Sequence, residues 1–228
     1  MKHSLKKAGG KNMPEQKGLF VVFEGGEGSG KSTQVKMLAD WLSQNGYANI
    51  TTKEPGDPQN NLCSTIRTML LDPRNSDMAS ATELLLFEAD RAQHVQKIIK
   101  PALEQRTIVV CDRYEASTFA YQCGGRGLPR QAFFTINDFA TGNLTPDIIF
   151  WMDVDPATGL ARAQAIKKQD RMESTGLAFH QKVRAGFAEF FASHEENTVK
   201  IDASLSPKAI HEIVVSHIGK LLAGHSSA

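Results

Sequence analysis

Short apolar runs alternate with longer amphipathic segments along most of this chain. Five runs of four or five residues, mostly rich in β-branched or aromatic side chains, predict strands: Leu19–Phe23, Ile50–Lys53, Thr107–Cys111, Ile148–Met152 and Val199–Asp202. Between them, apolar residues recur three and four positions apart, which is typical of helices. The expected helices are Ser32–Asn45, Leu62–Leu71, Ser80–Ile99, Ser117–Tyr121, Pro129–Ala140, 156–168, Phe179–His194 and one beginning at Pro207.

Local signals mark where several of these elements begin or end. Ser80 and Glu83 have the spacing of a capping box, in which each residue binds a free backbone N–H of the other. Asp155 followed by Pro156 is typical of a helix start. The glycine-rich run Gly124–Gly127 predicts a break between two helices.

Strands and helices alternate at least five times, so we expect an α/β fold. A doubly wound, mostly parallel five-stranded sheet with helices on both faces would bury these strands. A chain of 228 residues with 41% hydrophobic residues fits a single core, spanning residues 18–228. Residues 1–17 carry five lysines but no apolar segment, so we expect a disordered extension, with Met13 a possible start.

The charge balance, the apolar runs and the cysteines indicate which kinds of partner and compartment to expect. Lys and Arg total 26 and Asp and Glu total 25, so the basic excess of a nucleic-acid binder is missing. No apolar run approaches the length of a membrane span. The three cysteines form no CxxC pair, which favours free thiols in a reducing compartment. We therefore expect a cytoplasmic protein without nucleic-acid or membrane partners.

A glycine-rich loop follows the first strand and matches the phosphate-binding pattern G-x-x-x-x-G-K-[ST] from Gly25 to Ser32. Glycines let backbone N–H groups point at phosphate oxygens, and the helix that follows adds partial positive charge. Lys31 would reach the β- and γ-phosphates, and the Ser32 hydroxyl would bind Mg²⁺. The expected ATP-binding residues are Gly25, Gly26, Glu27, Gly28, Ser29, Gly30, Lys31, Ser32 and Thr33.

Asp112 directly follows the third predicted strand and is the second candidate ligand for Mg²⁺. An Asp in this position is often only a turn or cap residue. The phosphate-binding loop favours the metal role, because the carboxyl ends of neighbouring parallel strands meet at one edge of the sheet.

Other features distinguish among proteins with such a loop. The chain has no N-K-x-D run, which a GTPase would use to read guanine, and no serine-glycine-glycine signature of a transporter ATPase. Arginines in its middle third could hold a second phosphorylated substrate: Arg67, Arg91, Arg113 and Arg126. A kinase for nucleotides fits best, while a nucleotide hydrolase or switch without an acceptor stays open.

Several ordered motifs resemble those of bacterial thymidylate kinases, over Leu19 to about Leu222. They are Phe23–Thr33, Lys53–Gly56, Leu84–Arg91, Asp112–Thr118, Ala120–Gln122, Gly124–Gly127 and Phe179–Arg184. The resemblance implies transfer of a phosphoryl group from ATP to dTMP with Mg²⁺, and a homodimer.

The resemblance also implies roles for individual residues. Phe87 would stack on the thymine ring and Arg91 would hydrogen-bond its edge; the two are four positions apart, on one helix face. Thr118 and Gln122 would face the base, with Tyr121 under the deoxyribose. Glu54 would lie near the sugar and the acceptor phosphate, which Arg67 and Arg113 would hold.

The chain departs from the family pattern after the second strand and in the lid expected near residues 162–176. Lys53 stands where Arg is usual, and Asp57-Pro58 stand where Gly and Thr are common. Gln164 and Ile166 replace frequent lid arginines. Because the variable loop positions 26–29 carry no cation, transition-state charge must come from elsewhere. The expected catalytic residues are Lys31, Arg113, Arg162 and Arg171, whereas Lys167 and Lys168 fit a solvated connection.

Overall fold

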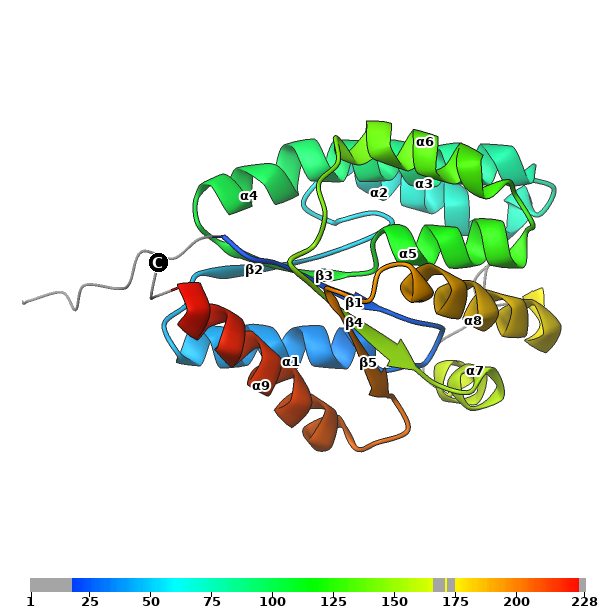
Figure 1. Ribbon diagram of the computed structural model, residues 1–228. Coiled ribbons are helices and arrows are strands. Elements are labelled where there is room, and N and C mark those ends of the chain that lie inside the picture. The colour runs from blue at the N-terminus through cyan, green and yellow to red at the C-terminus, as the bar shows by residue number, and fades with distance from the viewer. Residues whose placement is uncertain (1–17, 166–170, 172–174, 226–228) are drawn as a thin grey trace, which may run out of the picture.

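The computed structural model describes residues 18–165, 171 and 175–225. The expected N-terminal extension, residues 1–17, lies outside the described residues, as do 166–170 and 172–174 of the expected lid. In Figure 1 a central sheet lies between two groups of helices. None of the described helices is long and apolar enough to cross a membrane.

All neighbouring strands of the sheet run parallel. The strands are β1 (Phe20–Glu24), β2 (Asn49–Lys53), β3 (Ile108–Asp112), β4 (Ile148–Asp153) and β5 (Thr198–Asp202). Their order across the sheet is β2-β3-β1-β4-β5, with parallel pairing between each pair of neighbours. The predicted five-stranded α/β sheet is thus confirmed. Because β1 is central, the loop after it opens where the carboxyl ends of β1 and β3 meet, the usual place for ligands in such sheets.

The helices follow the predicted order, with bounds within a few residues of those expected. They are α1 (Lys31–Gln44), α2 (Asn61–Leu71), α3 (Ser80–His94), α4 (Lys100–Glu104), α5 (Glu115–Thr118), α6 (Arg130–Thr141), α7 (Pro156–Gln164), α8 (Leu177–Ala192) and α9 (Pro207–His225). Wider π-helical turns, η2 (Val95–Ile99) and η3 (Phe119–Gly125), join α3 to α4 and extend α5. A short 3-10 turn, η1 (Pro73–Asn75), follows α2.

Alternate residues of β1 build two cores on opposite faces of the sheet. Val21 and Phe23 pack with the buried faces of α1 and α9, including Leu38 and Val214. On the other face, Phe20 and Val22 belong to a cluster that α3, η3, α6 and α8 complete. Figure 1 shows the same division, with α1 and α9 together below the sheet. Helices therefore cover both faces, as a parallel sheet requires.

One local prediction, the capping box at the start of α3, was wrong. Ser80 is the first residue of α3 and its side chain caps nothing; Ala79 precedes the helix without a side-chain cap. Glu83 is 1% exposed and pairs with Arg126 instead of reaching back to the helix start. A buried carboxylate gains more from an arginine than from a backbone N–H that water can serve.

The expected break between two helices is present between η3 and α6, at residues 126–129, so it begins two residues later than the glycine run predicted. Helical geometry continues through Gly125, and the glycines there allow close approach of α8. A Cβ atom at Gly125 would lie 2.6 Å from the ring of Phe179. The absence of a side chain at Gly125 therefore serves packing between η3 and α8.

Candidate active site

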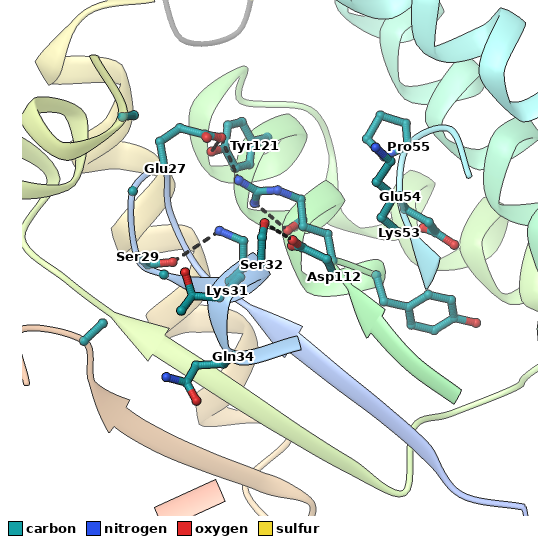
Figure 2. A pocket seen from close by; sticks show the side chains of 18 of the residues that line it. Glu27, Ser29, Lys31, Ser32, Gln34, Lys53, Glu54, Pro55, Asp112 and Tyr121 are labelled. Atoms are coloured by element: carbon teal, nitrogen blue, oxygen red, sulfur yellow. Dashed lines mark hydrogen bonds and ion pairs between the residues drawn. The ribbon is translucent and has the colours of Figure 1, made fainter. Parts of the chain in front are cut away.

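A cavity of about 1000 Å³ opens at the carboxyl ends of β1 and β3. Figure 2 shows its lining, with the glycine-rich loop and Asp112 on one side and Lys53, Glu54 and Pro55 across from them. Most of the residues expected to bind ATP, dTMP or Mg²⁺ or to take part in catalysis line it, whereas Gly25 and Gly26 do not. Those that line it are Glu27, Gly28, Ser29, Gly30, Lys31, Ser32, Thr33, Glu54, Arg67, Phe87, Arg91, Asp112, Arg113, Thr118, Tyr121, Gln122 and Arg162.

The loop between β1 and α1 folds tightly because of its glycines. Gly28 has a φ of +63°, and a Cβ atom there would lie 2.0 Å from the carbonyl oxygen of Gly159 in α7. No other residue type fits this close contact. The loop therefore packs on α7 while its other side faces the cavity.

Lys31 is 6% exposed and its ammonium group is turned onto the loop itself. It donates to the carbonyl oxygens of Gly25 at 3.0 Å and Gly26 at 2.7 Å. It also donates to the hydroxyl of Ser29, a contact that Figure 2 marks. Burial, followed by repulsion from Arg113, lowers the pKa of Lys31 to about 8. The Lys31 ammonium is thus held at the loop by carbonyl oxygens, which phosphate oxygens could replace as hydrogen-bond acceptors.

Ser32 and Asp112 bring two oxygen ligands together. The Ser32 hydroxyl donates to Asp112 Oδ2 at 2.5 Å, a contact drawn in Figure 2. Within the described residues no group of three His, Cys, Asp or Glu side chains could hold a metal ion by itself. One hydroxyl and one carboxylate nevertheless fit Mg²⁺, which prefers oxygen and completes its shell with water and substrate phosphates.

Arg113 follows Asp112 with a positive φ of 73°, which turns its side chain back toward the glycine-rich loop. Its guanidinium donates to the Gly25 carbonyl at 2.8 Å, to Ser117 at 3.0 Å and to Glu27 at 2.6 Å. Tyr121 donates to the same Glu27 oxygen at 2.9 Å. The sequence predicted Glu27 as an ATP-binding residue of the loop but did not predict its pairing with Arg113; the single hint was a carboxylate inside a phosphate-binding loop.

Arg91 is 1% exposed, and its guanidinium lies over the ring of Tyr114 as well as against polar groups. It donates to Glu54, Glu88 and Asn137 and, at 2.9 Å, to the Thr118 hydroxyl. Burial alone would lower the pKa of Arg91, but Glu54 and Glu88 outweigh it and raise that pKa. Arg91 therefore stays charged.

Phe87 lies on the same face of α3 as Arg91, and both line the cavity as their spacing predicted. Arg67, from α2, lines the cavity as well and donates to the Pro55 carbonyl at 2.6 Å. The residues expected at the acceptor thus come together from α2, α3, α5, η3 and the loop after β2.

The two lid arginines lie in different places. Arg162, in α7, lines the cavity and donates to the Ala203 carbonyl at 2.8 Å. Arg171 does not line the cavity; it is 7% exposed, pairs with Glu83 at 2.5 Å and donates to the Leu70 carbonyl at 2.7 Å. The structure therefore brings Arg162, but not Arg171, to the cavity.

Glu83 also holds two residues of the acceptor side. It accepts from Gln122 at 2.8 Å and from Arg126 at 3.1 Å, in addition to Arg171. The arginines hold the pKa of Glu83 below its usual range even though burial alone would raise it. Arg126, a candidate for acceptor phosphate, is thus engaged with Glu83 and does not line the cavity.

Comparison with known proteins agrees with this geometry. The family model described as "Thymidylate kinase" matches residues 23–214. The chain is 42% identical over 198 residues to a protein named thymidylate kinase from Nostoc sp. (strain PCC 7120 / SAG 25.82 / UTEX 2576), covering 86% of this chain and 93% of that one. A thymidylate kinase from Cutibacterium acnes is 40% identical over 205 residues, covering 90% and 98% respectively. On sequence match and fold together, the chain belongs to the thymidylate kinase family.

Proposed function

We propose that the protein transfers the γ-phosphoryl group of ATP to dTMP, giving ADP and the dTDP needed for dTTP synthesis. One observation carries the proposal: a single cavity connects the phosphate-binding loop to the Phe87–Arg91 face of α3. Two nucleotides can meet there tail to tail, with their phosphates between Lys31 and Arg113. The family to which the chain belongs supports this reading.

The donor half of the cavity contains the groups that ATP requires. Backbone N–H groups of the loop and Lys31 would bind its phosphates. Ser32 and Asp112 would hold Mg²⁺, which neutralises charge on the phosphates when it is bound. Their oxygens already lie 2.5 Å apart, so the ligand pair is formed by the protein alone.

The acceptor half offers an aromatic ring and polar groups suited to a pyrimidine. Phe87 would stack on the thymine, while Arg91, Thr118 and Gln122 would face its edge. Thr118 is fixed by Arg91, and Gln122 is fixed by Glu83. Tyr121 would pack under the deoxyribose, at the place that a 2′-hydroxyl would take.

Catalysis in this site is positioning and charge neutralisation. Arg113 and Arg67 would hold the acceptor phosphate, with Glu54 beside it, and Lys31 would contact the transferring group. Of the two lid arginines, Arg162 is the better candidate to reach the reacting phosphates, because it lines the cavity and Arg171 does not. The proposed catalytic role of Arg171 would require it to leave Glu83.

We also propose that the protein is a homodimer that works in the cytoplasm. Helices α2, α3 and α6 pack side by side and expose apolar side chains: Leu62, Met69, Leu85 and Phe139, the last 90% exposed. A second copy would cover this surface. Light scattering should give twice the monomer mass, and Phe139→Arg should lower it, whereas Leu177→Arg on α8 should not. All three cysteines are free thiols, which suits a reducing compartment.

The activity is tested by measuring ADP release from ATP and Mg²⁺ with and without dTMP. We expect release that depends on dTMP and yields equal amounts of dTDP. Lys31→Ala should abolish it, while Lys208→Ala, an equivalent change on an exposed lysine of α9, should not. ADP release at the same rate without dTMP would instead identify a hydrolase or a nucleotide-dependent switch.

A further inference from the structure

Asp57, one of the two residues that depart from the family pattern after β2, has a buried carboxylate with both oxygens engaged. The residue is 1% exposed. Its Oδ1 accepts the backbone N–H of Gln59 at 2.7 Å, and its Oδ2 is in hydrogen-bond contact with the Thr52 hydroxyl. Burying a carboxylate away from water is unfavourable unless its oxygens are hydrogen-bonded, so the contacts of Asp57 indicate a structural role.

From Asp57, the contacts continue to the acceptor side of the cavity. The Thr52 oxygen also contacts Nε2 of His94, which is 0% exposed. Nδ1 of His94 lies 2.8 Å from Glu54 Oε1, and the other oxygen of Glu54 accepts from Arg91 at 2.9 Å. Two side chains, those of Thr52 and His94, therefore join Asp57 to the Glu54 carboxylate that lines the acceptor site.

Counting protons along this row links the direction of each hydrogen bond to the charge on Asp57. A threonine hydroxyl has one hydrogen, and an ionised carboxylate only accepts. With Asp57 ionised, Thr52 gives its hydrogen to Asp57 and accepts one from Nε2 of His94. Glu54, which forms an ion pair with Arg91, accepts from Nδ1. Both ring nitrogens of His94 then carry hydrogen, so the ring is an imidazolium cation.

The other groups packed around His94 favour a cation there. Asp90, one turn earlier on α3, accepts from the Gly56 N–H at 3.0 Å. Burial, followed by the charge of Glu54, raises the pKa of Asp90 to about 6, so it is an anion at neutral pH. Burial raises the pKa values of the Cys63 thiol on α2 and the Cys111 thiol on β3, so both stay neutral. Arg91 is the nearby cation, and Glu88 also pairs with it.

We propose that Asp57 is an ionised positioning residue that holds His94 as an imidazolium, and that this cation offsets the charge of Glu54 beside the acceptor phosphate. The role in catalysis rests on the proposed function, whereas the charge on the ring does not. Without the cation, Glu54 would repel the phosphate of dTMP. Asp57 thereby sets the affinity for the acceptor without touching it.

Asp57→Asn removes the charge and keeps the shape. The N–H of Gln59 holds the oxygen of the new amide, so its NH₂ group faces Thr52. Thr52 then accepts from that NH₂ and donates its own hydrogen to Nε2. His94 becomes neutral, with hydrogen on Nδ1 only, and still donates to Glu54. Geometry is kept and only the positive charge is lost.

The test is ¹⁵N NMR of the full-length, ligand-free protein at pH 7.5, with the His94 signal among seven histidines assigned by its loss in His94→Gln. We expect two protonated ring nitrogens in the wild type and one in Asp57→Asn. The control Asp40→Asn, at an exposed position of α1, should leave the ring unchanged. A neutral ring in the wild type, which requires no variant to fold, would overturn the proposal.

Kinetics test the consequence for the acceptor. Asp57→Asn should raise KM for dTMP about tenfold, the scale of one charged hydrogen bond, with kcat and KM for ATP within about twofold. An unchanged KM for dTMP would overturn the positioning role even if the ring loses its proton. Failure of dTMP as a wild-type acceptor would overturn the proposed function instead, and the NMR result would still decide the charge of His94.

Discussion

The guanidinium of Arg113 lies 2.6 Å from the carboxylate of Glu27, so the phosphate-binding loop supplies a counter-ion for the proposed acceptor clamp. Both side chains are partly exposed to the cavity, at 16% and 19%. Tyr121 binds the same oxygen of Glu27 and lies under the Arg113 guanidinium. A phosphate that enters must therefore compete with Glu27 for Arg113.

Replacing Arg113 should separate activity from stability. Arg113→Ala should lower kcat/KM for dTMP at least about 10²-fold, because a phosphate contact that matters in the transition state is lost. Circular dichroism and thermal melting should still show a folded protein. Arg130→Ala, which breaks the exposed pair with Glu189, is the matched control and should keep normal activity. A fully active Arg113→Ala protein would contradict the proposal that Arg113 holds the acceptor phosphate.

The two lid arginines should differ in which kinetic constant they affect. Arg162→Ala should lower kcat about 10²-fold or more with little change in KM for dTMP, as removal of an arginine at the reacting phosphates does. Arg171→Ala should mainly raise KM for dTMP, because Glu83 loses one of the arginines that position it against Gln122. Steady-state kinetics of both variants decide this; a larger loss of kcat in Arg171→Ala would reverse the assignment.

The pKa of Lys31, lowered to about 8, should appear in the pH dependence of ATP use. Above pH 8 the free enzyme loses the charge that binds the β- and γ-phosphates, so kcat/KM for ATP should fall. Bound phosphates favour the charged form, so kcat at saturating ATP should persist to higher pH. The two pH profiles are measured with saturating dTMP. If kcat/KM and kcat fall together at the same pH, bound ATP does not stabilise the charged form of Lys31, and this prediction is wrong.

Glu88 should make stability decrease as pH rises. Burial raises its pKa to about 7 despite Arg91, so the folded state binds its proton more tightly than the unfolded state, whose value is near 4.5. This contribution is therefore favourable below pH 4.5 and is lost as pH rises to 7. Glu88→Gln mimics the neutral form and should be more stable than wild type by on the order of 1 kcal/mol at pH 8.

Urea unfolding at pH 5 and pH 8 measures that difference. The gap between Glu88→Gln and wild type should shrink toward zero at pH 5, where wild-type Glu88 is largely protonated. Glu189→Gln, on the exposed surface of α8, is a control in which no such gain at pH 8 is expected. An equal gap at both pH values would mean that packing, and not proton binding, causes the change.

The elements that the sequence predicted well are those whose signals are local. The loop from Gly25 to Ser32 carries its whole pattern within eight residues, and Asp112 stands directly after its strand. The partnerships that sequence reasoning missed join residues far apart in the chain. Glu27 and Arg113 are 86 positions apart, and no short pattern encodes their contact. Glu83 matched a capping box locally, but burial and distant arginines determined its role.

The choice of acceptor tests the central claim most directly. The measurement is kcat/KM with dTMP, dUMP, UMP, AMP and GMP as acceptors, at saturating ATP and Mg²⁺. Phe87, Arg91 and Gln122 favour thymine, and Tyr121 favours deoxyribose, so we expect dTMP to be best, dUMP weaker and the other three poor. Comparable kcat/KM for AMP or GMP would contradict the assignment of dTMP, while leaving the ATP-binding loop in place.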